Sequence, residues 1–175
     1  YGHLVSGDAN QPTVVKFTQY PHFDKKQKRW QGGAKVPDNP TGWSFVSSTG
    51  GHPNEADSCA IRRWIAPSSG VITIKGMVAH GAAQGDGVQA TLFSSRHGIK
   101  GTWDVHHREV QFETTFQVEP GDTIDMIVSE RTGHSYDSFR LIYSVNLVDS
   151  NSSMRTSWNS ERDFKGEAPV KAITV

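Results

Sequence analysis

From Ser58 onward the chain alternates apolar and polar residues in short runs, a period of two that is typical of half-buried β-strands. Between Gln111 and Val118, for example, the apolar Phe112, Phe116 and Val118 fall on one face. Similar runs lie at residues 58–65, 71–80, 88–93, 102–110, 123–130 and 139–148. No segment repeats apolar residues at the helical period, and residues favouring turns separate the runs. The pattern therefore predicts an all-β protein, specifically an antiparallel jelly-roll-like β-sandwich.

The regularity of the pattern divides the chain into three parts of one expected domain, 1–175. Residues 1–57 form an irregular N-terminal part with a few strands, 58–148 hold the regular strands, and 149–175 form a returning tail. Within the first part, only Thr13–Thr18 and Trp43–Ser47 have strand-like patterns.

Within the run 71–80, a glycine interrupts the alternation at Gly76, which predicts a β-bulge at that position. The apolar faces of the runs also predict the core of the sandwich. The residues expected to be almost free of solvent are Ile72, Ile74, Leu92, Phe116, Ile124, Met126, Phe139, Leu141 and Val145.

Charge and composition narrow the classes of partner. Lys plus Arg and Asp plus Glu balance at 18 each, so the formal net charge is zero. Because phosphate neutralisation supplies most of the affinity of nucleic-acid binders, this balance argues against a nucleic-acid partner. No stretch approaches the length of a transmembrane helix, so we expect no membrane insertion. The single cysteine, Cys59, lies in an alternating run and is expected to be a buried, inert thiol.

The common catalytic signatures are missing from the sequence. It contains no GxSxG, HExxH, GxGxxG or P-loop motif, so we expect no enzyme activity. The sequence His134-Ser135-Tyr136-Asp137 is better interpreted as a polar turn than as a catalytic triad, because triads assemble across a fold. The adjacent His106 and His107 point to opposite faces of a strand and cannot easily share a metal ion.

Aromatic residues give a stronger indication of function. Trp30, Trp43, Trp103 and Trp158 fall in expected loops or at strand ends, whereas Trp64 has the pattern of a core residue. Exposed aromatic faces with polar neighbours bind sugar rings, whose C–H face stacks while charged groups bind the hydroxyls. The alternative is that each tryptophan only covers one end of the sandwich.

Loops at one end or on one face of the sandwich are the natural place for such a site. The loops that combine aromatic and polar candidates are Gly81–Gly87, Ser94–Trp103 and Gly133–Asp137. The candidate ligand-binding residues in and beside them are His80, Asp86, Arg96, His97, Trp103, His134 and Tyr136.

Each candidate has an expected role. Trp103 or Tyr136 would be the stacking platform, with Arg96 and His80 as hydrogen-bond donors. Asp86, in the tight turn Gly85-Asp86-Gly87, would accept a hydrogen bond or ligate Ca²⁺. An Asx-type turn is the alternative interpretation of Asp86. The whole set also has an alternative, in which the loops only close the sandwich and Arg96 pairs with a nearby carboxylate.

Short motifs between Phe17 and Pro169 carry a family resemblance. They are Trp30-Gln31-Gly32-Gly33, Gly50-Gly51-His52-Pro53, Arg62-Arg63-Trp64, His80, Gly85-Asp86-Gly87-Val88, Ser94-Ser95-Arg96, Gly121-Asp122-Thr123-Ile124-Asp125, Asp137-Ser138-Phe139, and Trp158 with Asp163-Phe164-Lys165-Gly166. With these motifs the chain resembles the β-rich module of large planctomycete surface proteins, which also carry cytochrome c-like domains and planctomycete-specific domains of unknown function.

The resemblance implies a non-catalytic, jelly-roll carbohydrate-binding module of a secreted or surface protein that processes polysaccharides. Its partners would be a polysaccharide or oligosaccharide and other domains of the parent chain, and its location extracellular, at the cell surface or periplasmic. One alternative is a structural or protein-interaction domain that packs against a parent enzyme or cytochrome. A third is a sandwich-fold polysaccharide-degrading enzyme.

The resemblance also bears on haem and on the two ends of the chain. No CxxCH motif is present, so we expect no c-type haem in this segment. The chain starts without Met or a signal-peptide pattern, which suggests a processed product or a piece of a longer chain. As a module inserted in a larger protein, it should bring residues 158–164 beside residues 17–30.

Overall fold

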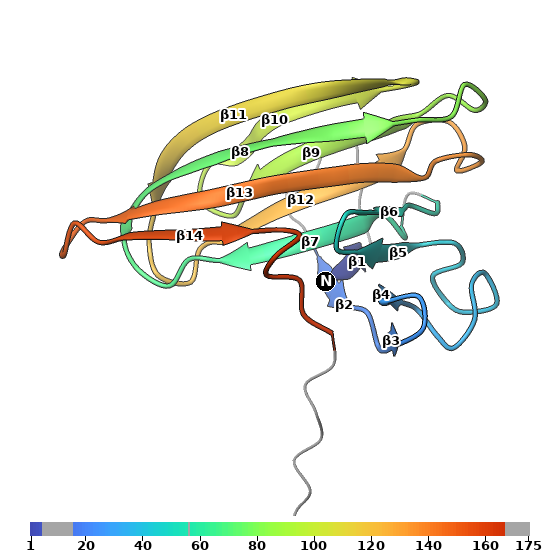
Figure 1. Cartoon of the computed structure of the whole chain (residues 1–175), viewed down its shortest axis with the longest axis horizontal. Helices are drawn as coiled ribbons and strands as arrows, with labels where there is room; N and C mark the ends of the chain where they lie inside the picture. Colours follow the sequence, from blue (N-terminus) through green and yellow to red (C-terminus); the bar gives the residue numbers. More distant parts are fainter. Residues whose placement is uncertain (5–15, 56, 167–175) are drawn as a thin grey trace, which may run out of the picture.

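The computed structural model describes residues 1–4, 16–55 and 57–166 and consists of two antiparallel β-sheets packed face to face (Figure 1). No helix occurs in these ranges, and hence no helix that could cross a membrane. The expected all-β antiparallel sandwich is confirmed. Most of the expected strand Thr13–Thr18 lies outside the described residues.

The first sheet combines the second half of the chain with two short N-terminal strands. In spatial order it contains β10 (Gly98–Val105), β9 (Val88–Ser94), β12 (Thr123–Glu130), β7 (Ala60–Ile65), β1 (Gly2–Leu4) and β2 (Phe17–Gln19). All neighbouring pairs are antiparallel.

The second sheet has long strands at one edge and short N-terminal strands at the other. Its order is β11 (Arg108–Val118), β8 (Gly70–His80), β13 (Phe139–Asp149), β6 (Gly50–His52), β5 (Phe45–Ser47), β4 (Arg29–Gln31) and β3 (His22–Asp24). Strand β14 (Arg155–Asn159) also pairs with β13. It pairs with residues 144–148 of β13, whereas β6 pairs with residues 139–140. Alternation predicted most of the long strands, whereas β1, β3, β4, β6 and β14 were missed. The expected single strand over 102–110 is wrong, because His106 and His107 form a turn between β10 and β11.

The core lies between the sheets and is built from the inward face of each long strand. Every core residue expected from the alternation is buried, with Phe116 the most exposed at 8%. Cys59 is buried, as the alternating pattern predicted.

The β-bulge expected at Gly76 is wrong. The register runs without interruption through Gly76, which faces Phe112 on β11 and Tyr143 on β13. A Cβ atom at this position would lie 2.4 Å from Cβ of Tyr143, so glycine is needed for close approach of the central strands. The irregularity occurs in β10 instead, between Ile99 and Gly101.

The C-terminal segment after β14 returns to the N-terminal strands. The indole N–H of Trp30 donates a hydrogen bond to the carbonyl of Lys165 at 2.8 Å. The Phe164 ring lies 4.6 Å from the ring of Tyr1 and 6.4 Å from that of Phe23. These contacts join residues from opposite ends of the described chain.

Candidate functional site

The register brings several loops to one end of the sandwich. His80, the last residue of β8, pairs with Arg108 at the start of β11 and with Phe139 at the start of β13. Glu130, at the end of β12, pairs with Val88 at the start of β9. The connections 81–87, 106–107 and 131–138 therefore share this end, which is referred to below as the His80 end.

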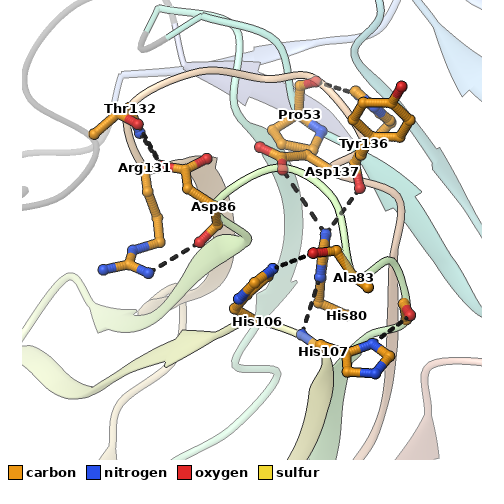
Figure 2. A network of polar contacts seen from close by, with 12 residues as sticks. Pro53, His80, Ala83, Asp86, His106, His107, Arg131, Thr132, Tyr136 and Asp137 are labelled. Carbon is orange, nitrogen blue, oxygen red and sulfur yellow. Dashed lines mark hydrogen bonds and ion pairs between the residues drawn. The ribbon is translucent and has the colours of Figure 1, made fainter.

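The side chain of His80 hydrogen-bonds two of these connections, 106–107 and 131–138 (Figure 2). Its side chain is buried, and Nε2 donates a hydrogen bond to the carbonyl of Tyr136 at 2.8 Å. On the other side of the ring, Nδ1 accepts the backbone N–H of His107 at 3.3 Å. A ring that donates through Nε2 and accepts at Nδ1 is a neutral imidazole. His80 therefore positions the loop that carries Tyr136 and has no free ring nitrogen for a ligand.

The adjacent histidines on the β10–β11 turn also bind loop carbonyls. His106 donates through Nε2 to the carbonyl of Ala83 at 3.2 Å, and His107 donates through Nδ1 to that of Gly81 at 2.9 Å (Figure 2). Both acceptors belong to the loop between β8 and β9. These two side chains hold that loop against the turn.

Tyr136 lies at the surface of the His80 end with 61% of its area exposed. Its φ angle of +68° is in the left-handed region, which is uncommon for residues other than glycine. Opposite it, the loop 81–87 approaches so closely that a Cβ atom on Gly85 would lie 2.5 Å from the carbonyl oxygen of Ser135. The aromatic ring is thus presented to solvent by a tightly packed turn.

An open pocket of about 350 Å³ lies beside Tyr136. Its lining comprises Trp43, His52, His134, Ser135 and Tyr136, a set that we call the aromatic pocket. Trp43 is 45% exposed, and its ring lies 6.3 Å from that of His52. The pocket thus has two exposed aromatic side chains and three polar ones from separate parts of the chain.

The protonation state of His52 defines one polar group of the pocket. Its Nδ1 hydrogen-bonds the carbonyl of Pro53, so in the neutral ring Nδ1 carries the proton and Nε2 is an acceptor. Burial lowers the pKa of His52, and the smaller effect of the hydrogen bond to the Pro53 carbonyl acts in the opposite direction. The neutral form therefore dominates at pH 7, with a hydrogen-bond acceptor at Nε2.

A buried carboxylate lies directly after Tyr136 in the chain. Asp137 has no exposed area, and in the described part of the protein neither of its side-chain oxygens has a hydrogen-bond partner. One of them lies 3.9 Å from Nε2 of His80 (Figure 2). Loss of solvation raises the pKa of Asp137 to about 7, and the charges of Asp86 and Glu130 act in the same direction. This carboxyl group therefore changes charge near neutral pH.

Asp86 lies on the opposite side of the same end and fixes a turn. One carboxylate oxygen accepts the backbone N–H of Thr132 at 2.7 Å and its hydroxyl at 2.6 Å, and Arg131 donates to the Asp86 carbonyl at 2.9 Å (Figure 2). Partial burial opposes ionisation, but the bonds from Thr132 keep the pKa of Asp86 below its ordinary value. Among the described residues, no group of three or more His, Cys, Asp or Glu side chains is placed to hold a metal ion.

The other sequence-predicted site residues lie away from this end. Arg96 forms a two-point ion pair with Asp122, at 2.6 and 3.2 Å, at the opposite end of the sandwich. His97 hydrogen-bonds the carbonyl of Gln117 at 2.9 Å, also at that end. Trp103 is part of β10 and its ring stacks on Phe112, 4.7 Å away.

The structure therefore brings together four of the seven predicted residues, His80, Asp86, His134 and Tyr136, and only the last two line the aromatic pocket. Sequence reasoning missed Trp43 and His52 as parts of this site. Trp43 was recognised as an aromatic residue outside the alternating core, which is the signal that could have included it. Its position beside Tyr136 depends on the packing of segments more than 80 residues apart in the chain.

Comparisons with known proteins give distant structural similarities. No protein-family model and no curated protein sequence matches the chain. The C-terminal CBM6 domain of LamC, a marine laminarinase from Zobellia galactanivorans, matches 55% of this chain and 74% of its own, with 17% sequence identity and a TM-score of 0.34. The C-terminal domain of EclA, a sugar-binding protein, matches 74% of this chain and 89% of its own, with 13% identity and a TM-score of 0.38.

Proposed function

We propose that this protein is a non-catalytic carbohydrate-binding domain and that the aromatic pocket is its binding site. The observation that supports this most is the pair of exposed aromatic side chains, Trp43 and Tyr136, on one open pocket. Large exposed aromatic rings are costly to leave in water unless a ligand covers them. A sugar ring offers a flat C–H face for stacking and hydroxyl groups for the polar wall.

The polar side of the pocket suits hydroxyl groups better than charges. Nε2 of His52 accepts a hydrogen bond, and the Ser135 hydroxyl both donates and accepts. Each sugar hydroxyl can also both donate and accept, so it is complementary to such a wall. The Nδ1 atom of His134 lies 3.7 Å from a carboxylate oxygen of Glu130, which fixes the ring at the rim. We infer a neutral sugar as the ligand.

The wider setting extends the proposal. We infer a module of a secreted or surface protein that processes polysaccharides, as the resemblance to planctomycete modules implies, with other domains of that protein as further partners. Asp86, on the opposite side of the His80 end, would accept a hydrogen bond or bind Ca²⁺. The alternative of a protein-interaction domain predicts the same exposed aromatic residues but no retention on glycans.

A glycan screen with two pocket variants tests the proposal. We expect the protein to be retained on at least one neutral polysaccharide and to leave that polysaccharide uncleaved. Trp43→Ala and Tyr136→Ala should each weaken binding at least tenfold, which is about 1.4 kcal/mol. Running the screen with Ca²⁺ and with a chelator tests the role of Asp86.

The opposite end of the sandwich provides the matched control. Arg96→Ala removes an exposed side chain far from the pocket and should bind the glycan like the parent protein. Melting temperatures of all variants must stay close to the parent value, so that unfolding is not read as lost binding. Retention on no glycan would contradict the proposal and favour the protein-interaction alternative.

A further inference from the structure

A second cavity, of about 140 Å³, lies between the two sheets and away from the aromatic pocket. Strand β7 of the first sheet contributes Arg62 and Trp64 to its walls, and β13 of the second sheet contributes Tyr143 and Val145. Trp158 of β14 forms a further wall, and the rest of the lining consists of Tyr1, Arg63, Asn159, Ser160 and Asp163. The cavity is thus formed where β14 continues the second sheet beyond the short strand β6.

Aromatic and polar side chains share the walls of this cavity. Trp64 and Trp158 meet edge to face with their ring centroids 5.2 Å apart. Both are partly buried and pack against the main core. An apolar protein cavity of about 150 Å³ is large enough to bind benzene. The space here is therefore of the size of a single six-membered aromatic ring.

A buried cation lies in the wall of the same cavity. Arg62 is only 3% exposed, and its terminal nitrogens donate to the backbone carbonyls of Leu141, Ser47 and Gly50 at 3.0, 2.6 and 3.3 Å. Its Nε atom is buried and has no hydrogen-bond partner among the described residues. Burial lowers the pKa of Arg62, the direction expected for a cation removed from water.

The carboxylates near the cavity are already paired with other cations. Asp125 is bound at two points by Arg63, at 2.7 and 2.8 Å. Asp163, at the rim, is bound at two points by Arg162, at 3.0 and 2.6 Å. Within the described residues no carboxylate forms an ion pair with Arg62. A buried guanidinium without an anion is costly, so an anionic ligand beside it would recover electrostatic free energy.

We propose that this cavity is a second binding site, for a small aromatic carboxylate of the size of benzoate. The ring would lie between Trp64, Trp158 and Tyr143, and the carboxylate would lie beside the guanidinium of Arg62. Charge-assisted bonds to a carboxylate are stronger than neutral ones, which makes the anion the preferred ligand over an uncharged ring of the same shape. The site is independent of the glycan-binding proposal, because none of its residues lines the aromatic pocket.

Titration with benzoate tests this site directly. Trp64 and Trp158 line the cavity, so we expect saturable changes in tryptophan fluorescence and a rise in melting temperature with benzoate concentration. Benzyl alcohol, which has the ring without the charge, should bind at least tenfold more weakly. Acetate, which has the charge without the ring, should also bind at least tenfold more weakly. Equal binding of benzyl alcohol and benzoate would overturn the assignment of Arg62 as the anion-binding group.

Two variants separate the charge from the space. Arg62→Met keeps most of the side-chain volume and should weaken benzoate binding at least tenfold while leaving benzyl alcohol binding unchanged. Val145→Phe fills the cavity and should abolish the binding of both, which provides a test if Arg62→Met does not fold. Trp43→Ala, in the aromatic pocket, is the control and should bind benzoate like the parent protein. The absence of saturable benzoate binding, or unchanged binding by Val145→Phe, would overturn the proposal.

Discussion

Asp137 carries a large electrostatic cost at the scale of a single residue. It is fully buried, and its oxygens have no hydrogen-bond donors among the described residues. The imidazole of His80, 3.9 Å away, is neutral and therefore does not offset the charge of the carboxylate. Burial and the charges of Asp86 and Glu130 all favour the protonated form. The acid form costs less to bury than the carboxylate, so pH controls the stability of this end of the sandwich.

The Asp137→Asn variant tests this cost. The native pKa is about 7 against an ordinary value of 3.8. Between these values the folded state holds a proton that the unfolded chain has released, so the free energy of unfolding falls as pH rises from about 4 to 7, by at most about 1.4 kcal/mol per pH unit. Above pH 7 the loss is complete. The asparagine variant should lack this slope. Its free energy of unfolding relative to that of the parent protein should therefore be higher at pH 8 than at pH 5.

Denaturant unfolding of both proteins across this pH range is the measurement. Other titrating groups, such as His52 with its lowered pKa, are shared by the two proteins, so the difference between them isolates Asp137. Parallel curves for the two proteins would show that Asp137 does not titrate in this window.

His80 is a positioning residue for Tyr136. Removing the ring in His80→Ala leaves the Tyr136 carbonyl and the His107 N–H without partners, so the turn with positive φ loses its support. We expect glycan binding at least tenfold weaker. His80→Gln retains a donor and an acceptor and should restore part of the affinity. The two variants should be compared at matched fractions of folded protein; equal binding by both would contradict a positioning role.

Part of the site could be predicted at the residue scale. His134 and Tyr136 were predicted because a polar turn with an aromatic residue is visible locally in the sequence. The role of His80 could not be predicted, because its burial depends on the register of β8 with β11 and β13. Arg96 pairs with a carboxylate, as the alternative interpretation expected, but the identity of its partner Asp122 could not be predicted because Asp122 lies on a different turn.

At the scale of elements, alternation identifies strands that bury a whole face. Strands β8, β11 and β13 each have 11 residues, long enough for a period of two to be recognised. The missed strands β1, β3, β4 and β6 have three residues each, too few for such a pattern. Strands β3, β4, β5 and β6 pair in chain order, and within the described residues only the pairs β1–β7 and β6–β13 join these short strands to distant long strands. Gly76 was misread because close strand approach and a bulge both favour glycine.

The packing between the long strands determines stability at this scale. Leu92 on β9 and Leu141 on β13 are at most 1% exposed and lie in opposite sheets. Truncating either to alanine should lower the free energy of unfolding by about 2–5 kcal/mol, because the cavity left behind adds to the lost burial. Val148→Ala, on the same strand as Leu141 but 40% exposed, is the matched control and should cost about 0.5 kcal/mol or less. A loss below about 1 kcal/mol at both leucines would contradict the core assignment.

At the scale of the whole molecule, the sandwich separates its candidate binding sites. The aromatic pocket is built on the His80 end by loops, whereas the second cavity, which Arg62 lines, lies between β7, β13 and β14. The segment that follows β14 covers the N-terminal strands, with Trp30 bound to Lys165 and Phe164 packed on Tyr1 and Phe23. Tyr1 lines the second cavity and its ring contacts Phe164, so one wall of that cavity depends on this segment remaining docked.

The Phe164→Ala variant tests that docking. Phe164 is half-buried between Tyr1 and Phe23, so its loss should lower the free energy of unfolding by about 1–2 kcal/mol, less than for a fully buried ring. Met154→Ala, 64% exposed in the turn before β14, is the control and should change stability little. Benzoate binding should weaken with Phe164→Ala because Tyr1, which lines the second cavity, loses its contact with the Phe164 ring, whereas glycan retention at the His80 end should stay unchanged. Equal loss of both binding activities would instead indicate that the sandwich unfolds as one unit, with no separate role for the C-terminal segment.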